Sequence, residues 1–144
     1  MLKHIPEILT PELLKVLMEM GHGDEIVIAD GNFPGAAIAQ RLIRLDGHGV
    51  PELLDAILQV MPLDAYVETP VMLMERMKCD LDMELPLWTR YEQIVVAHDE
   101  RGAQAFGAYE RFEFYRQAQR CFCIIQTSEQ SQYANIILQK GIVK

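Results

Sequence analysis

The residues best suited to proton chemistry surround a short apolar segment near the N-terminus, within MGHGDEIVIADG at 20–31. His22 stands between Gly21 and Gly23. An imidazole with an ordinary pKa of about 6.5 accepts and donates protons near neutrality. His22 is therefore a candidate general acid/base. The structural alternative is a turn histidine whose ring only hydrogen-bonds the end of the preceding helix.

Two carboxylates flank the same apolar segment, Asp24 before it and Asp30 after it. Aspartates at strand ends commonly cap turns or hold loop amides, which is the structural alternative for both. A strand rises roughly 3.3 Å per residue, so its two ends cannot serve one small ligand within one subunit unless the chain folds back. Either a loop brings the two ends together, or two copies of the protein share a site.

Further polar candidates lie in the C-terminal third of the chain. Arg111 and Tyr115 are four residues apart and share one helix face. Taken alone, this pair is typical of a surface ion pair beside a half-buried aromatic. Tyr133 and Asn135 lie at the start of an apolar segment, where asparagine is uncommon because it is depleted in strands. Tyr133 alone is also compatible with a plain core position.

The sequence disfavours a metal site and a disulfide framework. A site built on His22, Asp24 and Asp30 lacks a second histidine at helical spacing and a usable cysteine pair. Cys121 and Cys123 would point both thiols to one face of a strand, and small apolar core positions are the favoured interpretation. The odd total of three cysteines indicates a reducing cytoplasm. Nucleotide-binding and nucleophile motifs are absent as well, so no cofactor is expected.

Composition excludes several classes of partner. With 144 residues, half of them hydrophobic, the chain is expected to form a single domain over 1–144. The net charge of −8 argues against a nucleic-acid surface and against an anionic membrane. No segment approaches the ~20 apolar residues of a membrane span. Pro6 and Glu7 interrupt the region where a signal peptide needs an apolar run, which also favours a cytoplasmic location.

Helices and strands are predicted to alternate along the chain. Thr10 and Pro11 start an amphipathic helix over 11–20, which Gly21 is expected to end in a left-handed conformation. The wholly apolar segment 26–29 is typical of a strand buried on both faces. Further strands are expected at 40–45, 71–75, 121–127 and 135–139, and helices at 51–61, 88–98 and 110–120. Residues 78–86 are acidic and irregular. This order predicts an α/β three-layer sandwich, a central sheet with helices on both faces.

Three segments together resemble a known family: LLKVLMEMGHGDEIVIADGNFP at 13–34, RFEFYRQAQRCF at 111–122 and SEQSQYANIILQKG at 128–141. They are similar to the L-fucose mutarotases, relatives of D-ribose pyranase, over about residues 8–143. The RF-x-FY element, Gly23 and the segment MPLDAYVETPVMLME at 61–75 favour the fucose branch. The resemblance implies an RbsD-like fold and an isomerase of sugar anomers that needs no cofactor.

The resemblance also implies roles for individual residues. His22 would be the general acid/base and Tyr115 a second proton carrier, with Asp24 in support. The residues that would hold the sugar hydroxyls are Asp30, Asp64, Arg111, Tyr133 and Asn135. The family forms ring-like homo-oligomers, commonly decamers, with sites at subunit contacts. Such an assembly would solve the problem of the two strand ends.

Three alternatives to an L-fucose mutarotase stay open at this point. The first is D-ribose pyranase activity or mutarotation of another monosaccharide. The second is a sugar-binding module associated with transport and without catalysis, since the same pocket would bind a pentose or a deoxyhexose either way. The third is an inert structural oligomer, whose melting temperature no sugar would shift.

Overall fold

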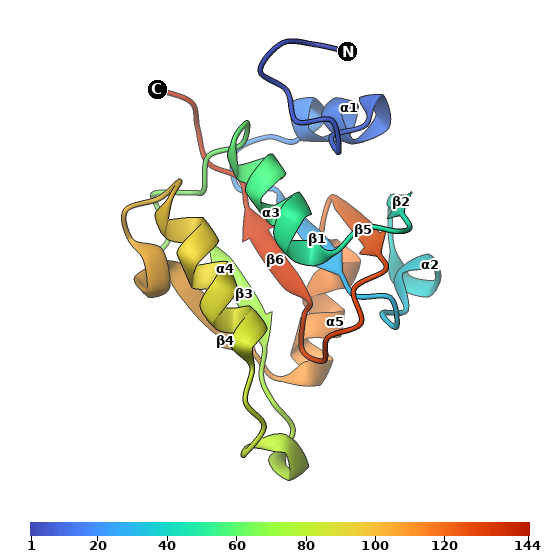
Figure 1. The fold of residues 1–144 in the computed structure, drawn as a ribbon, viewed down its shortest axis with the longest axis vertical. Helices are drawn as coiled ribbons and strands as arrows, with labels where there is room; N and C mark the ends of the chain where they lie inside the picture. The colour runs from blue at the N-terminus through green and yellow to red at the C-terminus, as the bar shows by residue number, and fades with distance from the viewer.

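A six-stranded mixed sheet forms the centre of the structure, a computed structural model that describes residues 1–144 (Figure 1). Its strands follow the order β2-β5-β1-β6-β3-β4. Their bounds are β1 Glu25–Ala29, β2 Leu42–Leu45, β3 Val71–Met74, β4 Phe106–Tyr109, β5 Cys123–Thr127 and β6 Ile136–Gln139. All neighbouring strands are parallel except β6, which runs antiparallel to both β1 and β3.

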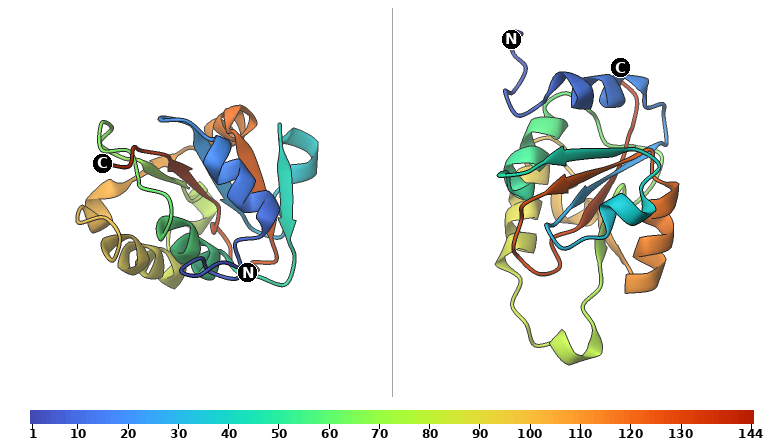
Figure 2. Two further views of the ribbon diagram at one scale, coloured as in Figure 1. Left: turned by 90° about the horizontal axis from the view of Figure 1, so that it is seen from above. Right: turned by 90° about the vertical axis from the view of Figure 1, so that its right-hand side faces the viewer.

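Helices cover both faces of this sheet, which confirms the predicted three-layer architecture (Figure 2). Helices α1 (Pro11–Glu19), α3 (Val50–Leu58) and α4 (Pro86–Val96) share one apolar cluster with Ile26 and Ile28 of β1. Val27 and Ala29 belong to a second cluster with α5 (Arg111–Arg120). Successive side chains of a strand point to opposite faces, so β1 is apolar throughout because both of its faces are buried.

The first helix begins as the sequence predicts but ends differently. Thr10 Oγ1 accepts a hydrogen bond from Leu13 N at 3.2 Å, and proline occupies the first turn. The helix ends at Glu19, and the expectation of a left-handed Gly21 is wrong. Gly23, with φ of +86°, has that conformation instead. The chain therefore turns just after His22 rather than just before it.

The remaining elements differ from expectation mainly at their ends. Helix α4 begins at Pro86, because proline is well tolerated in the first helical turn. Four elements are not predicted by the sequence pattern: the four-residue helix α2 (Gly35–Ile38), the edge strand β4 and two short 3₁₀ helices, η1 (Lys78–Asp80) and η2 (Gly102–Ala105). Strand β4 contains a glycine and no buried residue, so it lacks the apolar pattern by which strands are recognised.

The two neighbouring cysteines fill core positions but do not share a face. Cys121 lies before β5, in the cluster under α5, whereas Cys123 belongs to the cluster on the opposite side of the sheet. Burial raises the pKa of both thiols, that of Cys123 to about 12. None of the helices combines the length and the apolar character that a membrane span requires.

Candidate functional site

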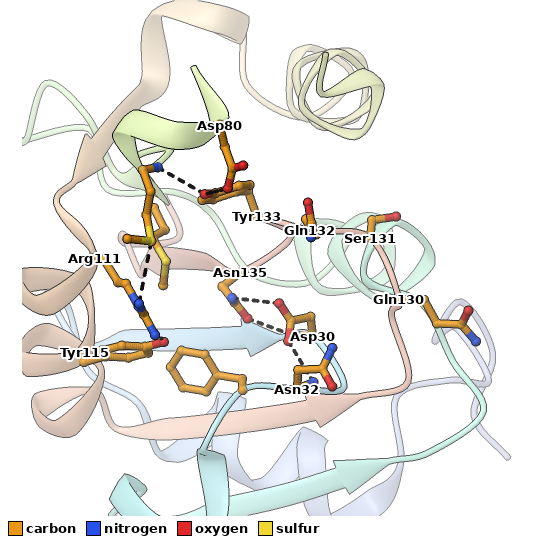
Figure 3. A pocket seen from close by; sticks show the side chains of 13 residues that line it. Asp30, Asn32, Asp80, Arg111, Tyr115, Gln130, Ser131, Gln132, Tyr133 and Asn135 are labelled. Atoms are coloured by element: carbon orange, nitrogen blue, oxygen red, sulfur yellow. Dashed lines mark hydrogen bonds between the residues drawn. The ribbon is translucent and has the colours of Figure 1, made fainter. Parts of the chain in front are cut away.

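A polar pocket of about 370 Å³ lies where β1 ends and β6 begins (Figure 3). Its walls come from the loop after β1, the start of α5, the loop before β6, and residues 75–85, which connect β3 to α4. We call it the Asp30 pocket. It is lined by Asp30, Asn32, Phe33, Met74, Met77, Asp80, Arg111, Tyr115, Gln130, Ser131, Gln132, Tyr133 and Asn135.

Asp30 and Asn135 form the floor of this pocket and hold each other in place. Asn135 Oδ1 accepts from Asp30 N at 2.8 Å, and Asn135 Nδ2 donates to Asp30 Oδ2 at 2.9 Å. Asp30 Oδ1 accepts from Asn32 N at 2.9 Å. Burial raises the pKa of the Asp30 carboxyl above its ordinary value, although these hydrogen bonds oppose the shift. The bonds to Asp30 also explain why an asparagine precedes an otherwise apolar strand.

Arg111 and Tyr115 form a second wall, at the start of α5. The Glu110 carboxylate caps this helix by accepting hydrogen bonds from Phe112 N and Glu113 N, which fixes the position of the first turn. Arg111 Nε donates to Tyr115 Oη at 3.4 Å, and Arg111 makes no ion pair. The surface ion pair of this helix joins Glu113 to Arg116 instead. The guanidinium of Arg111 is therefore available to a ligand.

Tyr133 completes the pocket from the loop before β6. Its backbone is left-handed, with φ of +55°, which is strained for a residue with a side chain. The phenol donates to Asp80 Oδ2 at 2.6 Å and accepts from Met77 N at 3.1 Å. The bond to Asp80 raises the pKa of Tyr133. Tyr133 is therefore held at the pocket by the 75–85 connection and is not a core residue.

His22 lies at the other end of β1, in a separate group that we call the His22 cluster: His22, Asp64, Tyr66 and Gln139. His22 Nε2 lies 3.0 Å from Asp64 Oδ1, so its ring contacts a carboxylate rather than the end of α1. The His22 side chain is 44% exposed, whereas that of Asp64 is only 3% exposed. The Tyr66 ring centroid lies 5.4 Å from that of His22.

Asp64 is fully engaged within the His22 cluster. Its Oδ1 also accepts from Tyr66 N at 2.9 Å, and its Oδ2 accepts from Gln139 Nε2 at 3.2 Å. Burial acts to raise the pKa of Asp64, but the hydrogen bonds from Tyr66 N and His22 outweigh it and the net shift is downward. Asp64 is thus a carboxylate at neutral pH, and a carboxylate only accepts hydrogen bonds. His22 Nε2 therefore carries a proton, which leaves Nδ1 free.

Asp24 shapes the turn that presents His22. Its Oδ2 accepts from Gly21 N at 2.7 Å, and its backbone carbonyl accepts from Lys140 N at 2.9 Å. Gly23 N donates in return to Lys140 O at 2.8 Å. The turn is therefore tied to the segment that follows β6, with only the imidazole projecting from it.

The predicted site residues fall into two groups within one protomer. The five residues of β1 separate His22 and Asp64 from the Asp30 pocket by roughly 16 Å. No loop brings the two ends together, so His22, Asp24 and Asp30 do not form one metal site. The structure gathers Asp30, Arg111, Tyr115, Tyr133 and Asn135 in the Asp30 pocket.

Several residues of these two groups were not predicted from the sequence. Met77 and Asp80 line the Asp30 pocket but belong to the acidic, aperiodic stretch, where no pattern distinguishes a pocket residue from a solvated one. Tyr66 joins the His22 cluster through its ring contact with His22, and Gln139 through its bond to Asp64; both contacts link distant parts of the chain. Only the tertiary structure reveals these residues.

Comparison with known proteins places this geometry in a family. The chain is 46% identical to a fucose mutarotase from Homo sapiens, over 99% of this chain and 94% of the relative. It superimposes on the crystal structure of FucU from Bifidobacterium longum with a TM-score of 0.96 and 54% identity, covering 99% of this chain and 100% of that one. A fucose mutarotase from Streptococcus pneumoniae, solved in complex with L-fucose, gives a TM-score of 0.93 at 46% identity, covering 99% and 100%. Residues 3–143 match the model of the RbsD / FucU transport protein family, and the chain therefore belongs to that family.

Proposed function

We propose that this protein is an L-fucose mutarotase, a single-domain isomerase that interconverts the α and β pyranose anomers of L-fucose. The observation that carries the proposal is the pairing, in one small chain, of a polar pocket with an exposed imidazole held by a carboxylate. Its relatives with 46% identity, the human protein and the Streptococcus pneumoniae protein bound to L-fucose, support the same activity and the same sugar.

The reaction needs only proton transfers. A base removes the proton of the anomeric hydroxyl while an acid protonates the ring oxygen, and the C1–O5 bond breaks to give the open-chain aldehyde. The aldehyde group then rotates. As O5 attacks the other face of C1, the deprotonated acid takes its proton back from the O5 hydroxyl, and the protonated base returns its proton to the aldehyde oxygen. Positioned acid/base groups typically contribute 10²–10⁴-fold, which is ample for a reaction that already proceeds in water.

His22 is the proposed base, and Asp64 its positioning residue. Because Nε2–H donates a hydrogen bond to the Asp64 carboxylate, the lone pair of Nδ1 is left to accept the proton of the anomeric hydroxyl. The family resemblance places Asp64 among the sugar ligands. Its hydrogen bonds to His22, Tyr66 and Gln139 favour the positioning role instead.

Tyr115 is the proposed second proton carrier. Its phenolic oxygen accepts a hydrogen bond from Arg111 Nε, so its own proton is free to be donated into the Asp30 pocket. The groups proposed to bind the sugar hydroxyls are Asp30, Arg111, Tyr133 and Asn135. The polar groups of these side chains, of which Asp30 and Asn135 are buried, would lose partners if a hydroxyl were missing, which supports selection of one sugar over another.

The separation of His22 from the pocket favours a site shared between copies of the chain. We infer that His22 of one subunit completes the Asp30 pocket of a neighbour, in a homo-oligomer that is a decamer and is located in the cytoplasm. The exposure of the His22 ring supports this arrangement, since a group that must reach a neighbouring subunit has to project from its own.

Saturation-transfer NMR on L-fucose tests the proposed function. The protein is expected to accelerate exchange between the α and β signals, and to act on L-fucose faster than on D-ribose in the same assay. A protein that binds the sugar but leaves the exchange rate unchanged would be a binding module. Faster exchange on D-ribose than on L-fucose would make it a D-ribose pyranase.

A further inference from the structure

The connection between β3 and α4, residues 75–85, extends well beyond the sheet and the helices, at the bottom of Figure 1. It contains η1, and contacts of Arg76 join its start to its end and to α4. Arg76 Nη1 donates to Met83 O at 2.7 Å, and the Arg76 guanidinium lies 5.9 Å from the ring centroid of Trp88. This connection contributes Met77 and Asp80 to the Asp30 pocket.

Tyr133, in the loop before β6, links this connection to the body of the protein. Its carbonyl accepts from Trp88 Nε1 at 2.8 Å, and its phenol bonds both Asp80 and Met77, as Figure 3 shows for Asp80. These three bonds stabilise a left-handed backbone that a tyrosine rarely adopts. Trp88 therefore fixes the Tyr133 backbone, whereas Asp80 and Met77 fix the orientation of the ring, and Asp80 supplies the charged partner.

The hydrogen bonds also fix what the phenol can still do. A phenol has one proton to donate and two lone pairs to accept with. Asp80 Oδ2 takes the proton, and Met77 N–H occupies one lone pair. One acceptor position remains. On the opposite wall Arg111 and Tyr115 have free donors, so the two walls of the pocket differ in hydrogen-bond polarity.

We propose that Asp80 is a positioning residue of the pocket: by accepting the hydrogen bond that the Tyr133 phenol donates, it leaves Tyr133 as an acceptor for one sugar hydroxyl. Asp80 then acts on specificity without touching the sugar. The inference rests on the proposed function only in taking a monosaccharide as the ligand. It adds a rule for which way one hydroxyl of that sugar must point its proton.

Calorimetric titration with L-fucose tests this inference in Asp80→Ala, Tyr133→Phe and the double variant. Each single change is expected to raise the Kd about 3- to 10-fold, the equivalent of one hydrogen bond. The double variant is expected to bind no more weakly than the weaker single variant, because both changes remove the same interaction. Asp82→Ala is the matched control, since Asp82 is exposed on the same connection and makes no hydrogen bond there; its Kd should equal that of the wild type.

A panel of L-fucose analogues that each lack one hydroxyl, at C2, C3 or C4, separates this role from a structural one. The wild type is expected to bind one of the three less tightly than L-fucose, and this penalty should vanish in Tyr133→Phe and in Asp80→Ala. If Asp80→Ala does not fold, Asp80→Asn replaces it. The amide keeps an oxygen that accepts the phenolic proton, so the penalty should persist there.

Three outcomes would overturn the inference: an unchanged Kd in Asp80→Ala, a double variant whose loss equals the product of the single losses, or a deoxy-sugar penalty that survives in Tyr133→Phe. Failure of the mutarotase proposal looks different. In that case the wild type binds L-fucose in the calorimeter and shows the same analogue pattern, but does not accelerate anomer exchange in the NMR assay.

Discussion

The two ends of β1 carry different kinds of chemistry. At the C-terminal end, the Asp30 pocket is concave, and Asp30 and Asn135 are buried and bonded to each other. At the N-terminal end, the His22 cluster presents an exposed ring on a turn, with its carboxylate partner buried beneath it. The side chains suited to binding a ligand thus lie in a pocket, whereas the side chain suited to proton transfer, that of His22, is exposed. This division is expected of a protein whose proton carrier acts on a ligand held by another subunit.

Removal of the His22 imidazole is expected to have the largest effect. His22→Ala should lower the catalysed rate of anomer exchange by about 10²–10⁴-fold, because the proposed general base is lost, while the fold stays intact. Saturation-transfer NMR measures the rate, and circular dichroism the fold. His48→Ala is the matched control: His48 is also half-exposed and pairs with a carboxylate, that of Glu52, but it belongs neither to the lining of the Asp30 pocket nor to the His22 cluster. Exchange at the wild-type rate in His22→Ala would remove His22 from the mechanism.

Mixing two inactive variants tests whether the two ends of β1 work across subunits. His22→Ala and the double variant Arg111→Ala/Tyr115→Phe should each be inactive alone. When they are refolded together in equal amounts, about one quarter of the shared sites receive both an intact His22 and an intact pocket, so activity should return to that level. If each subunit used only its own residues, the mixture would stay as inactive as its components.

On the binding side, a smaller change in affinity is expected. Arg111→Ala should weaken L-fucose binding about 10-fold, since a hydrogen bond to a charged group contributes ~1.5–3 kcal/mol and part of this is recovered by water. Calorimetric titration measures the change. Arg116→Ala, on the same helix, removes an arginine that is paired to Glu113 at the surface and should leave the affinity unaltered. Equal affinities for Arg111→Ala and the wild type would exclude Arg111 as a sugar ligand.

The smallest expected effect is a pH dependence of stability that originates in the His22 cluster. The folded-state pKa of Asp64 is lowered, so the unfolded chain takes up a proton first as the pH falls. The stability that the Asp64 carboxylate contributes is therefore present at neutral pH and is lost at and below its ordinary pKa of about 4. Urea unfolding at pH 7 and pH 3 should show a smaller loss of unfolding free energy in Asp64→Asn than in the wild type. Asp82→Asn should lose as much as the wild type; a wild-type loss in Asp64→Asn would contradict the shift.

The sequence was most informative where periodicity or capping determines structure. The apolar residues of β1 and the cap at Thr10 predicted their elements because local pattern and burial agree there. Boundaries were less predictable: Gly21 and Gly23 are both glycines, and only the bond from Gly23 to Lys140 shows which of them turns the chain. Strand β4, with no buried residue, offered no pattern at all.

The candidate site was predictable as a set of residue types but not as an arrangement. Asp30 and Asn135 stood out because each is a polar residue directly next to an apolar strand, and the structure joins them in one pocket. The separation of His22 from that pocket followed from the rise of a strand alone. Asp80 and Gln139, in contrast, become recognisable only through partners that lie far away in the sequence.

Strand β6 connects the two regions in one further respect. Asn135, just before it, holds Asp30, and Gln139, at its end, holds Asp64. Residues four apart along an extended segment point to the same side, so a slip of β6 by one residue against β1 would turn both amides away together. A register shift of β6 would therefore disrupt the Asp30 pocket and the positioning of His22 at the same time. A misaligned sheet would leave neither region functional.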